Sequence, residues 1–121
     1  MKTRTGFLTV AFAMATMFAS AAYATDLTTG TLIAGPDDYP YCVALNAGKK
    51  TVTVHVEMRG FDGSLVAGDD QTIDPTKVRS VLTGGPLAFY CTFSGRFSKS
   101  SIRGTAQVLD GSHTLAVLQA Q

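Results

Sequence analysis

The stretch Thr51-Val52-Thr53-Val54-His55-Val56-Glu57-Met58-Arg59 decides the fold class of this chain. Along it, aliphatic or thioether side chains alternate strictly with polar or charged ones. Successive side chains of a strand point to opposite faces of a sheet, so the alternation predicts one buried and one solvated face. Residues 51–59 are therefore expected to form a half-buried β-strand.

Similar short segments precede and follow this strand. The pairs Asp62-Gly63 and Asp110-Gly111 predict tight hairpin turns, because both residue types tolerate positive φ angles. Gly68-Asp69-Asp70 is interpreted as a turn between two short strands, and the segment 47–50 as the turn before residue 51. The strands at 41–46 and 51–59 and the one that follows are expected to form a meander. Further strands are expected at 28–34, 64–67, 71–73, 77–82, 87–93, 101–109 and 113–119.

No stretch after residue 24 combines helical periodicity with helix caps, and no internal repeat or linker divides the chain. Seven to nine short strands at regular spacing are typical of an antiparallel β-sandwich, immunoglobulin-like in general form, or of a small barrel. Residues 25–121 are too few for more than one such domain. The sequence thus predicts a single all-β domain.

The two cysteines allow a single pairing, Cys42 with Cys91. Leu87, Phe89, Cys91 and Phe93 share one face of their strand, which we interpret as the core face. The sequence therefore predicts a buried disulfide between core-facing strand positions.

The N-terminus has the organisation of a cleavable signal peptide over residues 1–24. Lys2 and Arg4 form a positive region, residues 7–19 are apolar, and Ala22-Tyr23-Ala24 matches the pattern that signal peptidases cleave. Cleavage after Ala24 is expected to leave no membrane span. Export would place the domain in the periplasm or the medium, where disulfides persist.

The charge balance argues against nucleic-acid binding. Without Lys2 and Arg4, eight Lys and Arg residues stand against nine Asp and Glu, a formal charge of −1. Nucleic-acid binders usually carry a basic excess, because neutralising phosphates supplies much of their affinity. We interpret the small cluster Arg96, Lys99 and Arg103 as a solvated surface.

Neither a metal site nor a cofactor site is expected. His55 and His113 are the only imidazoles, and a zinc or copper site normally needs more nitrogen or sulfur ligands than they supply. The acidic pairs Asp37-Asp38 and Asp69-Asp70, with Asp74, lack the spacing of a calcium loop. We interpret them as turn and solubility residues.

Catalysis is not expected either. Asp110, Ser112 and His113 have the residue types of a hydrolase triad, but adjacent residues of a strand point to opposite faces. The turn role of Asp110-Gly111 explains this segment, and no phosphate-binding loop precedes a helix. The sequence favours a protein that is not an enzyme.

Four aromatic residues form the candidate binding surface: Tyr41, Tyr90, Tyr39 and Phe61. Tyr41 and Tyr90 each adjoin a core-facing cysteine, so strand alternation turns both outward, where aromatic side chains commonly mark recognition surfaces. If the cysteine strands are neighbours in one sheet, the two tyrosines can pair. If the disulfide joins facing sheets, they lie on opposite surfaces. The alternative interpretation is that each tyrosine only covers neighbouring backbone.

Three segments carry a resemblance: Tyr41-Cys42-Val43-Ala44-Leu45-Asn46, the strand 51–59, and Phe89-Tyr90-Cys91-Thr92-Phe93. Their cysteine spacing is similar to that of immunoglobulin-like domains, but the central Trp is missing. The three segments together resemble a loose set of small exported bacterial β-sandwich proteins of unassigned activity. The resemblance implies a bacterial origin and no particular site residue.

These observations lead to one expectation about function. The chain is expected to be an exported, non-enzymatic module that binds a protein or an envelope component. Self-assembly into a homo-oligomer through exposed strand edges is the alternative, and a small hydrolase or metal protein is a third.

Overall fold

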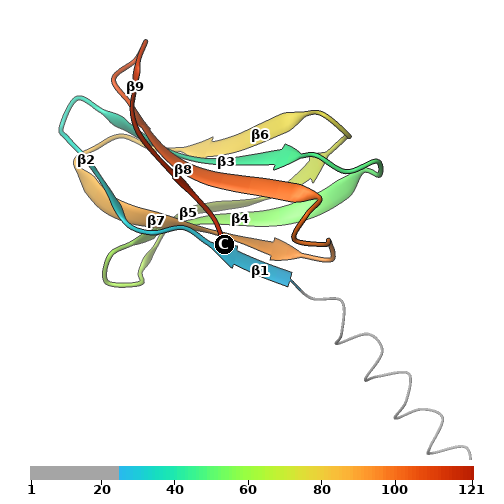
Figure 1. The fold of residues 1–121 in the computed structure, drawn as a ribbon. Coiled ribbons are helices and arrows are strands. Elements are labelled where there is room, and N and C mark those ends of the chain that lie inside the picture. Colours follow the sequence, from blue (N-terminus) through green and yellow to red (C-terminus); the bar gives the residue numbers. More distant parts are fainter. Residues whose placement is uncertain (1–24) are drawn as a thin grey trace, which may run out of the picture.

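The computed structural model describes residues 25–121, which form nine β-strands in two packed antiparallel sheets (Figure 1). The model confirms the all-β antiparallel sandwich. The proposed signal peptide, residues 1–24, lies outside the described residues. The strands are β1 (Thr25–Thr28), β2 (Leu32–Ala34), β3 (Tyr39–Asn46), β4 (Val52–Gly60), β5 (Leu65–Ile73), β6 (Val78–Leu82), β7 (Leu87–Gly95), β8 (Ile102–Leu109) and β9 (Thr114–Gln119).

Sheet A has the strand order β1-β7-β4-β5, and β2 also pairs with β7. Sheet B has the order β6-β3-β8-β9. All neighbouring strands within each sheet are antiparallel. Only the β4–β5 and β8–β9 connections are hairpins within one sheet, so most turns carry the chain from one layer to the other.

The expected meander is wrong, because β3 lies in sheet B and β4 lies in sheet A. The segment 47–51 crosses between the sheets and does not close a hairpin. Buried Asn46 organises this crossing: its Nδ2 donates to the carbonyls of Lys50 (2.7 Å) and Ile73 (2.9 Å). Its Oδ1 accepts a hydrogen bond from the Gly48 amide at 2.9 Å.

The expected turn at residues 68–70 is also wrong, because β5 runs without interruption from Leu65 to Ile73. The long neighbouring strand β4 offers a continuous ladder, with Val52 opposite Ile73 and Met58 opposite Ala67. β5 is an edge strand of sheet A, where acidic side chains can reach solvent and also discourage pairing with other chains. Edge position thus allows Asp69 and Asp70 to occupy strand residues.

The single strand expected at 28–34 is divided into β1 and β2, which both pair with β7. Thr29, which is buried, fills the gap between them. Its hydroxyl accepts a hydrogen bond from the Cys91 amide (3.0 Å) and donates one to the Gly30 carbonyl (2.8 Å). A side chain therefore replaces one backbone partner of β7 at this break.

The core lies between the sheets and is closed by the predicted Cys42–Cys91 disulfide, which the structure confirms. Both cysteines are fully buried. Cys42 belongs to β3 of sheet B and Cys91 to β7 of sheet A, so the bond joins the two facing layers. The largest fully buried side chains around it include Phe89, Phe93 and Met58.

Close packing across the layers depends on one glycine, Gly104 of β8. A Cβ atom at this position would lie 2.5 Å from ring atoms of Phe93 in the opposite sheet. Glycine therefore lets the Phe93 ring pack directly on the backbone of β8. Within residues 25–121 there is no helix long and apolar enough to cross a membrane.

Candidate functional site

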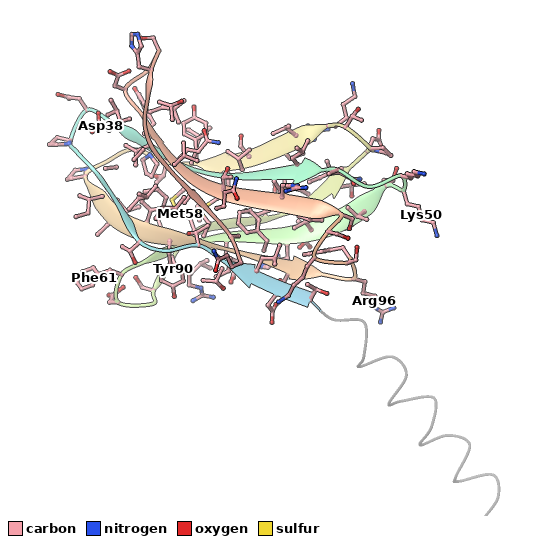
Figure 2. All side chains as sticks on the ribbon, in the orientation of Figure 1. Asp38, Lys50, Met58, Phe61, Tyr90 and Arg96 are labelled. Atoms are coloured by element: carbon pink, nitrogen blue, oxygen red, sulfur yellow. A yellow bond between two sulfur atoms is a disulfide. The ribbon has the colours of Figure 1, made fainter. Side chains whose placement is uncertain are left out.

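The disulfide geometry decides where the candidate aromatic residues lie. Because it joins facing sheets, Tyr41 and Tyr90 lie on opposite outer surfaces and do not form a pair. Tyr39 lies two residues before Tyr41 on β3, so both project from sheet B. Phe61 follows β4 and its amide donates to the Ala88 carbonyl, which places it on sheet A near the end of β7 that precedes Tyr90 (Figure 2).

Apolar side chains predominate on the outer surface of sheet B, but polar ones lie between them: Ser80, Arg103, Thr105, Gln107, Thr114 and Gln119 also take outward register positions. Cross-strand register places Tyr41 opposite Leu82 and Gln107, and Leu45 opposite Val78 and Arg103. We call its apolar side chains the sheet B face: Tyr39, Tyr41, Val43, Leu45, Val78, Leu82, Leu109 and Val117. About half of the surface of Val78, Leu82 and Val117 is exposed. Arg103 is the only charged residue at the outward register positions of this sheet.

The outer surface of sheet A is polar and carries a chain of ionisable groups. Nδ1 of His55 lies 2.6 Å from Asp70 Oδ1, and its Nε2 lies 3.3 Å from Glu57 Oε2. The other Glu57 oxygen accepts a hydrogen bond from Arg59 Nη2 at 2.9 Å. Opposite charges on adjacent strands favour this sheet register. Sheet A thus has the polar outer face typical of a solvated antiparallel sheet, whereas the outer face of sheet B mixes apolar and polar residues.

These ion pairs shift the pKa values of His55 and Glu57 in opposite directions. Hydrogen bonding to Asp70, and then to Glu57, raises the pKa of His55 from its ordinary value of 6.5. The hydrogen bond from Arg59 is the main cause that lowers the pKa of Glu57 from 4.5. Because these side chains are at least partly exposed to water, each interaction stabilises the fold only modestly.

A pH dependence of stability follows from these directions. The raised pKa of His55 means that its contribution is present below 6.5 and is lost as pH rises through the folded-state value. The contribution of Glu57 is present above 4.5 and is lost as pH falls. Urea unfolding should therefore show that His55→Gln lowers the free energy of unfolding between pH 4.5 and 6.5. At a pH above the folded-state pKa of His55, the same substitution should lower it less. His113→Gln is the control, and equal behaviour of the two variants would contradict the assignment.

The triad residue types meet in the β8–β9 turn, but not in catalytic order. Ser112 Oγ lies 2.9 Å from His113 Nδ1, and Asp110 Oδ1 lies 3.7 Å from the same nitrogen. A Ser-His-Asp site needs the hydroxyl and the carboxylate on opposite ring nitrogens. Asp110 Oδ1 instead accepts hydrogen bonds from the Ser112 and His113 amides, as expected of a turn residue.

The acidic pairs are separated by the fold. Asp38 Oδ2 accepts a hydrogen bond from the Gly35 amide in the turn before β3. Asp70 lies on β5 and pairs with His55 of β4. Asp74 accepts the Thr51 hydroxyl near the other end of the sandwich. Among residues 25–121, no group of three or more His, Cys, Asp or Glu side chains is arranged to hold a metal ion.

Charge is distributed unevenly between the two ends of the sandwich, a feature that sequence analysis missed. The connections 47–51, 74–77 and 96–101 meet at one end and carry Lys49, Lys50, Lys77, Arg96 and Lys99 against Asp74, a formal charge of +4. We call this the basic end. The connections 35–38, 61–64, 83–86 and 110–113 meet at the opposite, acidic end and carry a formal charge of −4, with no Lys or Arg.

The sequence holds no simple signal for the basic end. Lys49-Lys50 and Arg96 are more than 40 positions apart and come together only because both connections cross between the sheets at the same end. Figure 2 shows Lys50 and Arg96 at this end, with Asp38 and Phe61 at the other. The formal charge of the whole domain conceals this separation.

Comparisons with known proteins support the fold alone. No family model matches the chain, and no curated protein matches it. The fold is similar to the crystal structure of Thermotoga maritima 1070, with a TM-score of 0.51 and 13% sequence identity. The similarity covers 79% of this chain and 91% of that one. At this identity it extends to the β architecture and to no activity.

Proposed function

We propose that this chain is an exported, non-enzymatic binding module of the bacterial envelope or secretome, and that it docks a protein partner on the sheet B face. The observation that carries this proposal is that eight apolar side chains lie on this outer surface, which has no Asp or Glu at its outward register positions, whereas sheet A has a charged outer surface. The N-terminal signal pattern and the disulfide support export.

The size of the sheet B face fits recognition. With strands about 4.8 Å apart and about 3.3 Å per residue, four strands of five to eight residues cover on the order of 400 Å² in projection. The apolar side chains occupy roughly half of this area and are interspersed with polar ones. An apolar centre with polar groups around it is the usual composition of a protein interface. Tyr39 and Tyr41 supply the aromatic anchors that such centres favour.

The experiment compares two aromatic pairs on opposite sheets. Tyr39→Ala with Tyr41→Ala should weaken partner capture from the native host envelope by about 30-fold or more, the effect of losing a binding hot spot. Tyr90→Ala with Phe61→Ala is the matched control and should leave capture unchanged. Equal loss in both variants, or in neither, would contradict docking on the sheet B face.

The second candidate function is self-assembly, for which the same surface could serve. A mass by light scattering that rises with protein concentration, and returns to the monomer value in the Tyr39→Ala, Tyr41→Ala variant, would favour a structural subunit. A constant monomer mass together with partner capture supports the binding module.

A further inference from the structure

A hollow of about 340 Å³ opens at the basic end, between the connections 47–51 and 96–101. Its volume lies in the range of small-molecule sites. Three cationic side chains line it, Lys49, Lys50 and Arg96. The rest of the wall is formed by Gly48, Val52, Phe97, Ser98 and Ser101.

The cationic side chains of this hollow form no ion pairs within residues 25–121. Lys49, Lys50 and Arg96 are all exposed. By contrast, Arg59 on sheet A is paired with Glu57. Like charges gathered at one end repel one another, so an anion bound among them would be favourable.

The walls of the hollow are held in place by buried groups. Asn46 binds both the Gly48 amide and the Lys50 carbonyl, which fixes the first connection. The Ala47 amide donates to the Ser101 carbonyl at 2.8 Å and so ties the two connections together. On the other side, the Thr25 hydroxyl donates to the carbonyl of Phe97 at 2.6 Å, and the Phe97 ring is buried.

This support lowers the cost of binding, because the backbone of the site is ordered before a ligand arrives. The long cationic side chains remain free to adjust around an anion. Ser98 and Ser101 also line the hollow. Ser101 Oγ donates to the Ser98 carbonyl and Ser98 Oγ pairs with Ser100 Oγ, so both hydroxyls are partly used but keep acceptor capacity. The hollow therefore combines positive charge and two hydroxyl groups with a wall that is otherwise mainly apolar, from Val52 and Phe97.

We propose that this hollow binds a phosphorylated saccharide, with Lys49, Lys50 and Arg96 on the phosphate and Ser98 and Ser101 on sugar hydroxyls. Arg can hold two phosphate oxygens at once, and Lys adds compact positive charge. The site lies at an end of the sandwich and is separate from the sheet B face, so it does not depend on the proposed protein docking.

The test titrates the exported protein with fructose 1,6-bisphosphate, with inorganic phosphate, and with fructose, followed by calorimetry and amide chemical shifts. The bisphosphate should bind at least about tenfold more tightly than inorganic phosphate, and neutral fructose should not bind. Shifts should concentrate at residues 47–52 and 96–101. Lys50→Gln and Arg96→Gln should each weaken binding about tenfold, the loss of one charge-assisted contact.

Arg79→Gln is the matched control, since Arg79 is an exposed cation on β6 that does not line the hollow. If it weakens binding as much as Lys50→Gln does, the attraction is general and the site is refuted. Binding to phosphatidylglycerol vesicles without binding of the bisphosphate would replace the saccharide with a lipid headgroup. A self-association that Lys50→Gln abolishes, without bisphosphate binding, would instead assign the hollow to the acidic end of a second copy.

Discussion

Removing the Cys42–Cys91 disulfide is expected to lower the free energy of unfolding by about 4 kcal/mol. The bond closes a loop over a sequence separation of 49 residues, and in the loop-entropy model it acts mainly by restricting the unfolded chain. It also joins the two sheets at positions that are fully buried. Domains of this kind are stable by about 5–15 kcal/mol, so the loss would be a large part of the total.

The measurement is urea unfolding of the oxidised protein and of the Cys42→Ala, Cys91→Ala variant. Adding a reductant should shift the unfolding midpoint of the native sequence towards that of the variant and leave the variant unchanged. Because both sulfur atoms are buried, reduction under native conditions should be slow and should accelerate when urea opens the fold. A difference of less than about 1 kcal/mol between the two proteins would contradict the expectation.

Alternation of side chains and turn residues predicted most of the strands. β3, β4, β6, β7, β8 and β9 each begin and end within two residues of the expected positions, although β6 and β9 have no fully buried residue. The prediction failed for β5, because Gly68-Asp69-Asp70 has the composition of a turn and only the ladder with β4 makes it a strand. It also missed the break between β1 and β2, where the hydroxyl of Thr29 replaces a backbone partner.

Alternation could not say which strands share a sheet. It identifies the residues that face the core, but in a sandwich both layers face the same core. For this reason alternation alone does not place Tyr41 relative to Tyr90, whereas the disulfide between β3 and β7 puts them on opposite layers. The basic end could not be predicted from alternation for the same reason. Lys50 and Arg96 come together only because their connections cross between the sheets at the same end.

A substitution of Asn46 is expected to destabilise the fold strongly. It is a fully buried polar residue, and its amide satisfies three backbone groups, those of Gly48, Lys50 and Ile73. These contacts tie the crossover 47–51 to the end of β5. In sequence terms Asn46 is simply the last residue of an alternating strand, so its role depends on the path of the chain beyond it.

Asn46→Leu should destabilise the fold by about 3 kcal/mol. Leu is close to Asn in shape but leaves one amide and two carbonyls without their partners, and each lost bond costs about 1 kcal/mol. Gln107→Leu is the matched control, because that half-buried amide bonds only the Thr105 hydroxyl on the outer surface of sheet B. The control should change stability by about 0.5 kcal/mol or less in urea unfolding. Equal losses of unfolding free energy in the two variants would show that the crossover does not depend on Asn46. A larger loss in Asn46→Leu, together with faster hydrogen exchange at the Gly48 amide, would support the role of Asn46 in fixing the segment that carries Lys49 and Lys50.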